Sequence, residues 1–162
     1  MKRMAPLASV AAAAALGVAA TGSAAASTTA SASSSRISST MTAKQVKPTP
    51  LGNVASARGV LAGKATLAAP RSQIAWKLTY SGMTGRVVAA LVRFTNPKGV
   101  TTAISLCVKP CTSGQTSFTF FRSKAEGEYF VNQVKAGKVD AVLQTKKNPA
   151  GEIRGVLKST EG

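Results

Sequence analysis

Only five side chains in this chain of 162 residues are acidic, and histidine is absent. Without an imidazole, the Ser-His-Asp and Cys-His catalytic sites and most zinc and copper sites are excluded. A pair of carboxylates of the kind that cleaves glycosides is the remaining enzymatic option. The carboxylates are those of Glu126, Glu128, Asp140, Glu152 and Glu161. Glu126 and Glu128 point to different sides of a predicted helix and Glu161 lies in the C-terminal tail, so we expect no catalytic residues and no cofactor.

The two cysteines, Cys107 and Cys111, enclose a three-residue segment that contains Pro110. In an exported protein a disulfide is the default state of such a pair, and Pro110 favours the turn that a short loop needs. A redox pair would have the spacing Cys-x-x-Cys near a helix start, and two thiolates without histidine leave a tetrahedral metal shell incomplete. We therefore predict a structural disulfide and no metal site.

The charge is the property that indicates a partner. The chain carries 21 basic and 5 acidic residues, a net charge of +16, and the part from Leu51 onward retains 16 basic and 5 acidic residues, or +11. Polyanions such as teichoic acids, acidic polysaccharides, anionic lipid headgroups or extracellular nucleic acid are the matching class. The alternative is a basic surface that only confers solubility.

Specific recognition of nucleic acid is not expected, because the basic residues are scattered singly and no aromatic platform or recognition helix is evident. Lys146 and Lys147 form the only adjacent basic pair after the N-terminal segment. They are the candidate polyanion contacts.

Residues 1–26 have the composition of a secretory signal peptide. Lys2 and Arg3 precede an alanine-rich run over residues 5–20, and residues 24–26 are three alanines suited to signal peptidase. A retained membrane anchor is the alternative, but the run is too short and too weakly apolar to span a bilayer. We predict cleavage and a secreted protein, extracellular or associated with the cell surface, with no transmembrane segment after cleavage.

Residues 27–50 contain 12 Ser or Thr among 24 residues, and Pro48 and Pro50 close the segment. This composition buries too little apolar surface to offset the entropy of ordering, which predicts a disordered spacer. The folded domain is then expected over residues 51–162.

From Leu51 onward, polar and apolar residues alternate with the period of half-buried strands. In the clearest run, Trp76 shares one face with three other apolar residues, which indicates a core anchor rather than a platform for sugars or bases. The expected fold is all-β, an antiparallel β-sandwich of about seven strands over residues 60–67, 73–80, 86–94, 102–108, 116–121, 139–145 and 152–157. One short helix over residues 124–135 precedes the penultimate strand, with Ser123 and Glu126 forming a capping box and Gly137 ending it.

The run from residue 148 to residue 157 resembles the closing motif of the chordin (CHRD) domain family, whose modules end in Asn-Pro-x-Gly-Glu-Ile-Arg-Gly-x-Leu. The matching positions are Asn148, Pro149, Gly151, Glu152, Ile153, Arg154, Gly155 and Leu157. Weaker similarity extends over residues 51–157. The resemblance implies a secreted β-sandwich module of mostly unknown activity. Together with the charge and the lack of catalytic groups, it leads us to expect a non-enzymatic module that binds at the cell surface or in the extracellular matrix, with a low-affinity electrostatic binder of free polyanions as the alternative.

Three positions depart from the family pattern. Where members often carry histidines in the third and the penultimate strand, this chain has Leu91, Arg93 and Gln144. Any role of those histidines therefore does not transfer, and Arg93, which repels cations, is expected to pair with a carbonyl or with a carboxylate such as Asp140. The growth-factor partner of chordin does not transfer either, because a shared module does not fix function.

Glu152 and Arg154 lie two residues apart in the closing motif, so both are expected on one face of the last strand. Their side chains would then form an ion pair, or Arg154 would bond strand carbonyls and fix the register. The alternative is an arginine that binds a ligand. The identity of the ligand and the oligomeric state do not follow from the sequence.

Overall fold

The computed structural model describes residues 32–107 and 111–161, without the side chain of Glu161. The predicted signal peptide lies outside these residues. Among the described residues no helix is both long enough and apolar enough to cross a membrane.

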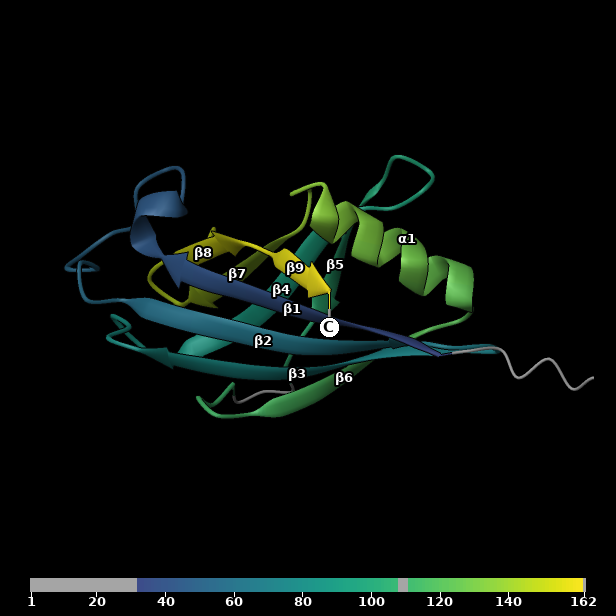
Figure 1. The fold of residues 1–162 in the computed structure, drawn as a ribbon. Helices are drawn as coiled ribbons and strands as arrows, with labels where there is room; N and C mark the ends of the chain where they lie inside the picture. The colour runs from purple at the N-terminus through teal and green to yellow at the C-terminus, as the bar shows by residue number, and fades with distance from the viewer. Residues whose placement is uncertain (1–31, 108–110, 162) are drawn as a thin grey trace, which may run out of the picture.

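One antiparallel sheet of nine strands, nearly closed into a barrel, forms the molecule (Figure 1). Neighbouring strands follow the order β5-β4-β7-β8-β1-β2-β3-β6, and β9 pairs with β1. The strands are β1 (Ser33–Thr42), β2 (Arg58–Leu67), β3 (Ser72–Ser81), β4 (Val87–Thr95), β5 (Thr101–Ser105), β6 (Thr116–Phe121), β7 (Asp140–Thr145), β8 (Ile153–Val156) and β9 (Lys158–Glu161). The short 3-10 helix η1 (Ala43–Gln45) and the α-helix α1 (Lys124–Lys135) complete the fold.

The all-β class is confirmed, but the sandwich of seven strands is wrong. Strands β1 and β9 were not predicted, and β1 overturns the sandwich, because it lies between β8 and β2 and joins the two groups of predicted strands into one continuous sheet. Without β1, β5-β4-β7-β8 and β2-β3-β6 would be separate sheets of four and three strands, which together are the seven strands that the sequence pattern predicts.

The prediction of a disordered spacer is also wrong for the residues that form β1 and η1. All ten residues of β1 pair with β2, from Ser33 opposite Leu67 to Thr42 opposite Arg58. Its inward positions are Ser35, Ile37, Ser39 and Met41, all buried. Two of these four positions are serines, so the alternation is hidden in a segment whose composition is typical of disorder.

The core gathers around Phe130 of helix α1, which covers one open side of the curved sheet (Figure 1). The ring of Phe130 contacts Trp76 edge-on at 6.3 Å between centroids, Phe94 at 5.2 Å and Phe121 at 5.4 Å. The indole N–H of buried Trp76 donates to Thr119 Oγ1 at 3.0 Å. Trp76 is therefore a core anchor, as the strand pattern predicts.

Helix α1 spans the predicted residues. Ser123 Oγ accepts a hydrogen bond from Glu126 N at 3.2 Å, and Gly137 has a φ of +67° where the helix ends. Gly127, a poor helix former, is needed because a Cβ there would lie 2.5 Å from Ser72 Cβ. The helix thus packs against the sheet more closely than any larger residue allows.

Candidate functional site

The closing motif forms a buried turn between β7 and β8. Asn148 bridges this turn to a distant segment, accepting from Leu51 N at 2.6 Å and donating to Leu51 O at 3.3 Å. Gly155 lies against β1, where a Cβ would collide with Thr40 O. These contacts lie within the fold and fix where β8 meets the rest of the sheet.

Glu152 is fully buried, with 0% of its surface exposed. Thr84 donates to its carboxylate from both the backbone N–H and the hydroxyl, Thr145 Oγ1 donates at 2.7 Å, and Asn148 Nδ2 donates at 3.1 Å. Burial alone would raise the pKa of Glu152, but these hydrogen bonds outweigh it and hold the pKa below its ordinary value. The residue is an ionised anchor of the turn with no route to a ligand.

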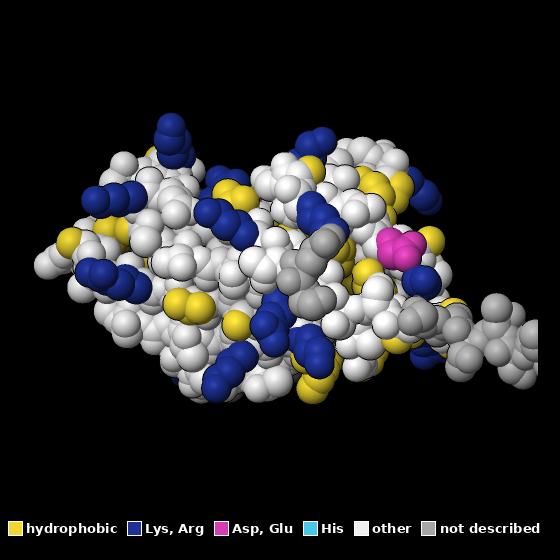
Figure 2. Space-filling model, in the orientation of Figure 1, with side chains coloured by type: hydrophobic (Ala, Val, Ile, Leu, Met, Phe, Trp, Pro, Cys, Tyr) yellow, Lys and Arg dark blue, Asp and Glu magenta, His cyan; other side chains and the backbone are white. Residues whose placement is uncertain are grey.

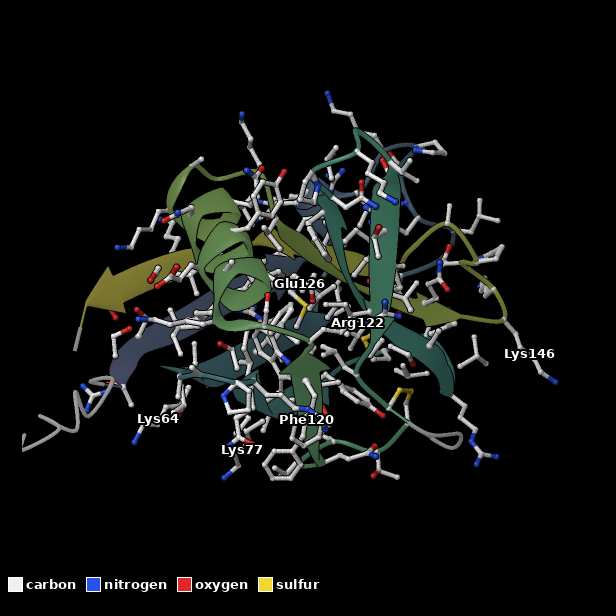
Figure 3. The ribbon with its side chains drawn as sticks, turned by 90° about the vertical axis from the view of Figure 1, so that its right-hand side faces the viewer. Lys64, Lys77, Phe120, Arg122, Glu126 and Lys146 are labelled. Atoms are coloured by element: carbon white, nitrogen blue, oxygen red, sulfur yellow. A yellow bond between two sulfur atoms is a disulfide. The ribbon has the colours of Figure 1, made fainter. Side chains whose placement is uncertain are left out.

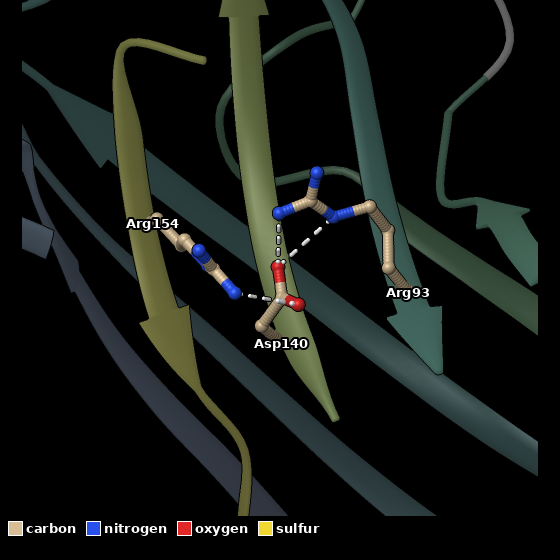
Figure 4. Close-up of polar contacts among 3 residues, drawn as sticks. All are labelled: Arg93, Asp140 and Arg154. Atoms are coloured by element: carbon tan, nitrogen blue, oxygen red, sulfur yellow. Dashed lines mark hydrogen bonds and ion pairs between the residues drawn. The ribbon is translucent and has the colours of Figure 1, made fainter. Parts of the chain in front are cut away.

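The expected pair between Glu152 and Arg154 is wrong. Strand β8 begins at Ile153, so Glu152 belongs to the buried turn, while Arg154 is half-exposed on the outer face. Arg154 Nη2 instead lies 3.2 Å from Asp140 Oδ1, and Arg93 donates from Nε and Nη2 to Asp140 Oδ2 at 3.1 and 2.7 Å (Figure 4). The contact expected between Arg93 and Asp140 is present.

The three positions where relatives carry histidine lie on two neighbouring strands. Leu91 and Arg93 are two apart on β4, and the register pairs them with Val142 and Asp140 of β7, two and four residues before Gln144. The topology therefore brings these positions to one face, but Arg93 and its partner Asp140 occupy its polar part. Asp140 is shared by Arg93 and Arg154, so this group carries a net positive charge that disfavours a cation there.

The carboxylates of Glu126 and Glu128 also have partners within the fold. Glu126 Oε2 accepts from Arg122 N at 2.9 Å, and Glu128 lies 3.6 Å from Lys124 Nζ on the helix surface. Within residues 32–107 and 111–161, no three His, Cys, Asp or Glu side chains gather where they could hold a metal ion. The carboxylates with described side chains thus stabilise turns, the helix and the sheet.

Cys107 and Cys111 are joined by a disulfide, with their Cα atoms 5.3 Å apart. The bond lies in the connection between β5 and β6, the two edges of the sheet. Tyr80 donates its hydroxyl to Cys111 O at 2.8 Å, and Gly114 N donates to Leu78 O at 2.7 Å. The disulfide therefore belongs to a segment that is fixed to β3.

The outer face of β1, β2, β3 and β6 carries cations without acidic residues. These four strands contain no Asp or Glu, and their basic residues, Arg36, Arg58, Lys64 and Lys77, are all exposed. Figure 2 shows dark blue basic side chains scattered across the visible surface and little magenta. We call the outward side of these four strands the cationic face.

Three of these cations are neighbours. The register places Arg36 directly opposite Lys64, and Lys64 opposite Ala75, so that Lys77 is the diagonal neighbour of Lys64. Among the described residues none of the three makes an ion pair. Like charges directly opposite each other destabilise a sheet, so this arrangement opposes folding.

Two hollows lie along the cationic face. A shallow depression of about 310 Å³ has Arg36, Lys64 and Lys77 among its lining residues. A larger one of about 640 Å³ lies where β8 and β9 meet β1, with Arg154 and Lys158 among its lining residues. Cations therefore border both hollows.

Strand β6 places aromatic rings at the edge of this face, where the sequence indicated none. Phe118 and Phe120 are 58% and 66% exposed, and their rings stack with centroids 6.4 Å apart at 24°. The side chains that point inward are Ser117 and Thr119, because Thr119 bonds the buried indole N–H. Two phenylalanines at alternate positions, with polar Thr119 between them, are the sequence signal for this pair.

Lys146 and Lys147, the predicted polyanion contacts, are exposed in the turn between β7 and β8. In Figure 3, Lys146 lies far from Lys64, Lys77 and Phe120, which project together from one side of the sheet. The structure does not bring the predicted pair to the cationic face, and their role remains a prediction.

A model of the CHRD domain family matches residues 18–157, most of the chain. Searches among curated proteins and among solved structures found no match.

Proposed function

Because this chain belongs to the CHRD domain family, we propose that it is an exported, non-enzymatic module that binds polyanions at the cell surface or in the extracellular matrix. CHRD domains occur in extracellular proteins. Binding of free polyanions at low affinity is the second candidate, and it would use the same surface.

The observation that carries the proposal is the unneutralised group of Arg36, Lys64 and Lys77. Their repulsion disfavours the folded state, yet the four strands that carry them contain no carboxylate to relieve it. A bound polyanion would replace this repulsion with attraction and release counterions from the ligand. Such a surface fits a linear ligand of repeating negative charge.

The carboxylates support a non-catalytic role. Glu152 is buried in the turn between β7 and β8, Asp140 forms ion pairs with two arginines, and Glu126 caps the N-terminus of helix α1. A general acid needs a titratable group that can reach the substrate, and these groups are committed to the fold.

The test measures retention of the exported protein on immobilised heparin, a sulfated polysaccharide, across a salt gradient. We expect late elution, with binding that weakens steeply as salt rises. Replacing Arg36 and Lys64 by Gln should move elution to markedly lower salt. It should also leave the melting temperature equal or higher, because the like-charge pair is gone.

The matched control is Lys98→Gln with Lys138→Gln, which removes two exposed charges from the turn between β4 and β5 and from the turn between α1 and β7, outside the four strands of the cationic face. This variant should elute close to the parent. An equal loss in both double variants would show that the charge acts diffusely, and elution of the parent with a neutral β-domain would overturn polyanion binding altogether.

A further inference from the structure

The exposed phenylalanines of β6 need an explanation that charge does not supply. Two aromatic side chains more than half exposed on an edge strand present apolar surface to water and invite unwanted pairing with other strands. A polyanion that binds by charge alone would make no use of them.

The register places the rings in line with the cations. Arg36, Lys64, Ala75 and Phe118 are successive partners across β1, β2, β3 and β6. Lys77, two residues from Ala75, pairs with Thr116 at the start of β6. Positive charges and aromatic rings therefore lie on the same side of the sheet, with the small side chain of Ala75 between Lys64 and Phe118. Figure 3 shows Lys64, Lys77 and Phe120 on this side.

This combination matches the chemistry of single-stranded nucleic acid. Its backbone phosphates are attracted by cations, and its unpaired bases stack on aromatic rings whatever their identity. Duplex DNA offers the same phosphates but keeps its bases inside the helix. Acidic polysaccharides offer charge without flat aromatic groups, and their hydroxyl groups would find no carboxylate acceptor on these four strands.

We propose that the cationic face binds single-stranded nucleic acid without sequence preference, with phosphates on Lys64 and Lys77 and bases on Phe118 and Phe120. The inference rests on the proposed polyanion binding and narrows its ligand class. It assigns the rings a role in affinity and the lysines a role in the dependence on salt.

The experiment measures fluorescence anisotropy of a labelled 20-nucleotide oligothymidine, with a duplex of the same length and a heparin fragment as parallel ligands. The parent should bind the single strand more tightly than the duplex. Phe118→Leu with Phe120→Leu keeps apolar bulk on the strand but removes the rings, and it should weaken single-strand binding about tenfold or more. Heparin binding and the salt dependence should stay unchanged in this variant.

Lys64→Ala with Lys77→Ala should instead flatten the salt dependence, by about 0.7 in log-log slope for each phosphate that is no longer neutralised. Val100→Ala, which alters another exposed apolar residue in a turn away from β6, is the control and should bind as the parent does. Melting curves of all variants verify folding.

Three results would overturn this inference alone: equal binding of single strand, duplex and heparin, a phenylalanine variant that binds oligothymidine as the parent does, or a parent dimer that this variant converts to monomers. The last would show that a second copy covers the rings. Failure to bind any of the three ligands would instead overturn the proposed function.

Discussion

Glu152 is a buried carboxylate that no cation neutralises among the described residues. Its donors are all uncharged: the backbone and hydroxyl of Thr84, the hydroxyl of Thr145 and the amide of Asn148. A buried charge is tolerated when hydrogen bonds replace its lost hydration, and here they come from two segments that are far apart in the sequence. The carboxylate therefore holds the loop before β4 against the turn between β7 and β8.

Replacing Glu152 by Gln should lower the free energy of unfolding at pH 7 by about 1–3 kcal/mol, because the new amide is a donor that faces other donors. Urea unfolding measures the loss. Glu128→Gln is the matched control, since it removes an exposed pair with Lys124 and should change stability by about 0.5 kcal/mol or less. A Glu152 variant as stable as the parent would show that this network contributes nothing net.

At the scale of elements, β1 decides the architecture. It pairs along its whole length with β2 on one side and with β8 and β9 on the other. Removing it would expose the backbone edges of β2 and β8 and would take the buried side chains of Ile37 and Met41 out of the core.

A chain that begins at Leu51 should therefore fail to fold, whereas a chain that begins at residue 32 retains every described strand. Circular dichroism and thermal melting of the two truncations provide the comparison. We expect a cooperative melt for the longer chain and none for the shorter one. A cooperative melt of the shorter chain would mean that the domain folds without β1.

The sequence predicted those elements whose apolar residues follow a clear period. The helix and the strands around Trp76 and Val92 were of this kind, and their ends agree with the structure within three residues. Strand β1 was not predicted because serines occupy half of its inward positions. Strand β9 was not predicted because it has only four residues and none of them is apolar.

Side-chain contacts were predictable only between strands whose adjacency was known. The contact of Arg93 with Asp140 was expected from the resemblance to the CHRD family, and β4 and β7 are indeed neighbours. The partners of Glu152 were not predictable, because Thr84 lies 68 residues away in a loop whose sequence shows no periodic pattern. Likewise, the cationic face is invisible in a sequence whose basic residues are scattered singly until the register of β1, β2 and β3 aligns them.

For the molecule as a whole, stability against pH depends on few groups, because the chain has no histidine and only five carboxylates. Hydrogen bonds hold the pKa of Glu152 below its ordinary value, so its stabilisation is present above the unfolded pKa and is lost as pH falls through the lower folded one. Burial raises the pKa of Tyr80, although Arg86 opposes the rise. The stabilisation from Tyr80 is therefore present below its unfolded pKa and lost as pH rises through the folded one.

We thus expect a plateau of stability between pH 5 and 8, with a decline in acid that depends on Glu152 and a decline in alkali that depends on Tyr80. Urea midpoints measured from pH 2 to pH 11 trace the profile. Glu152→Gln should be less stable on the plateau but lose less on acidification, and Tyr80→Phe should lose less on alkalinisation, since each variant lacks the group that titrates. A step inside the plateau would reveal a titrating group whose pKa lies far from its ordinary value, and an acid limb unchanged in the Glu152 variant would show that Glu152 does not cause the acid sensitivity.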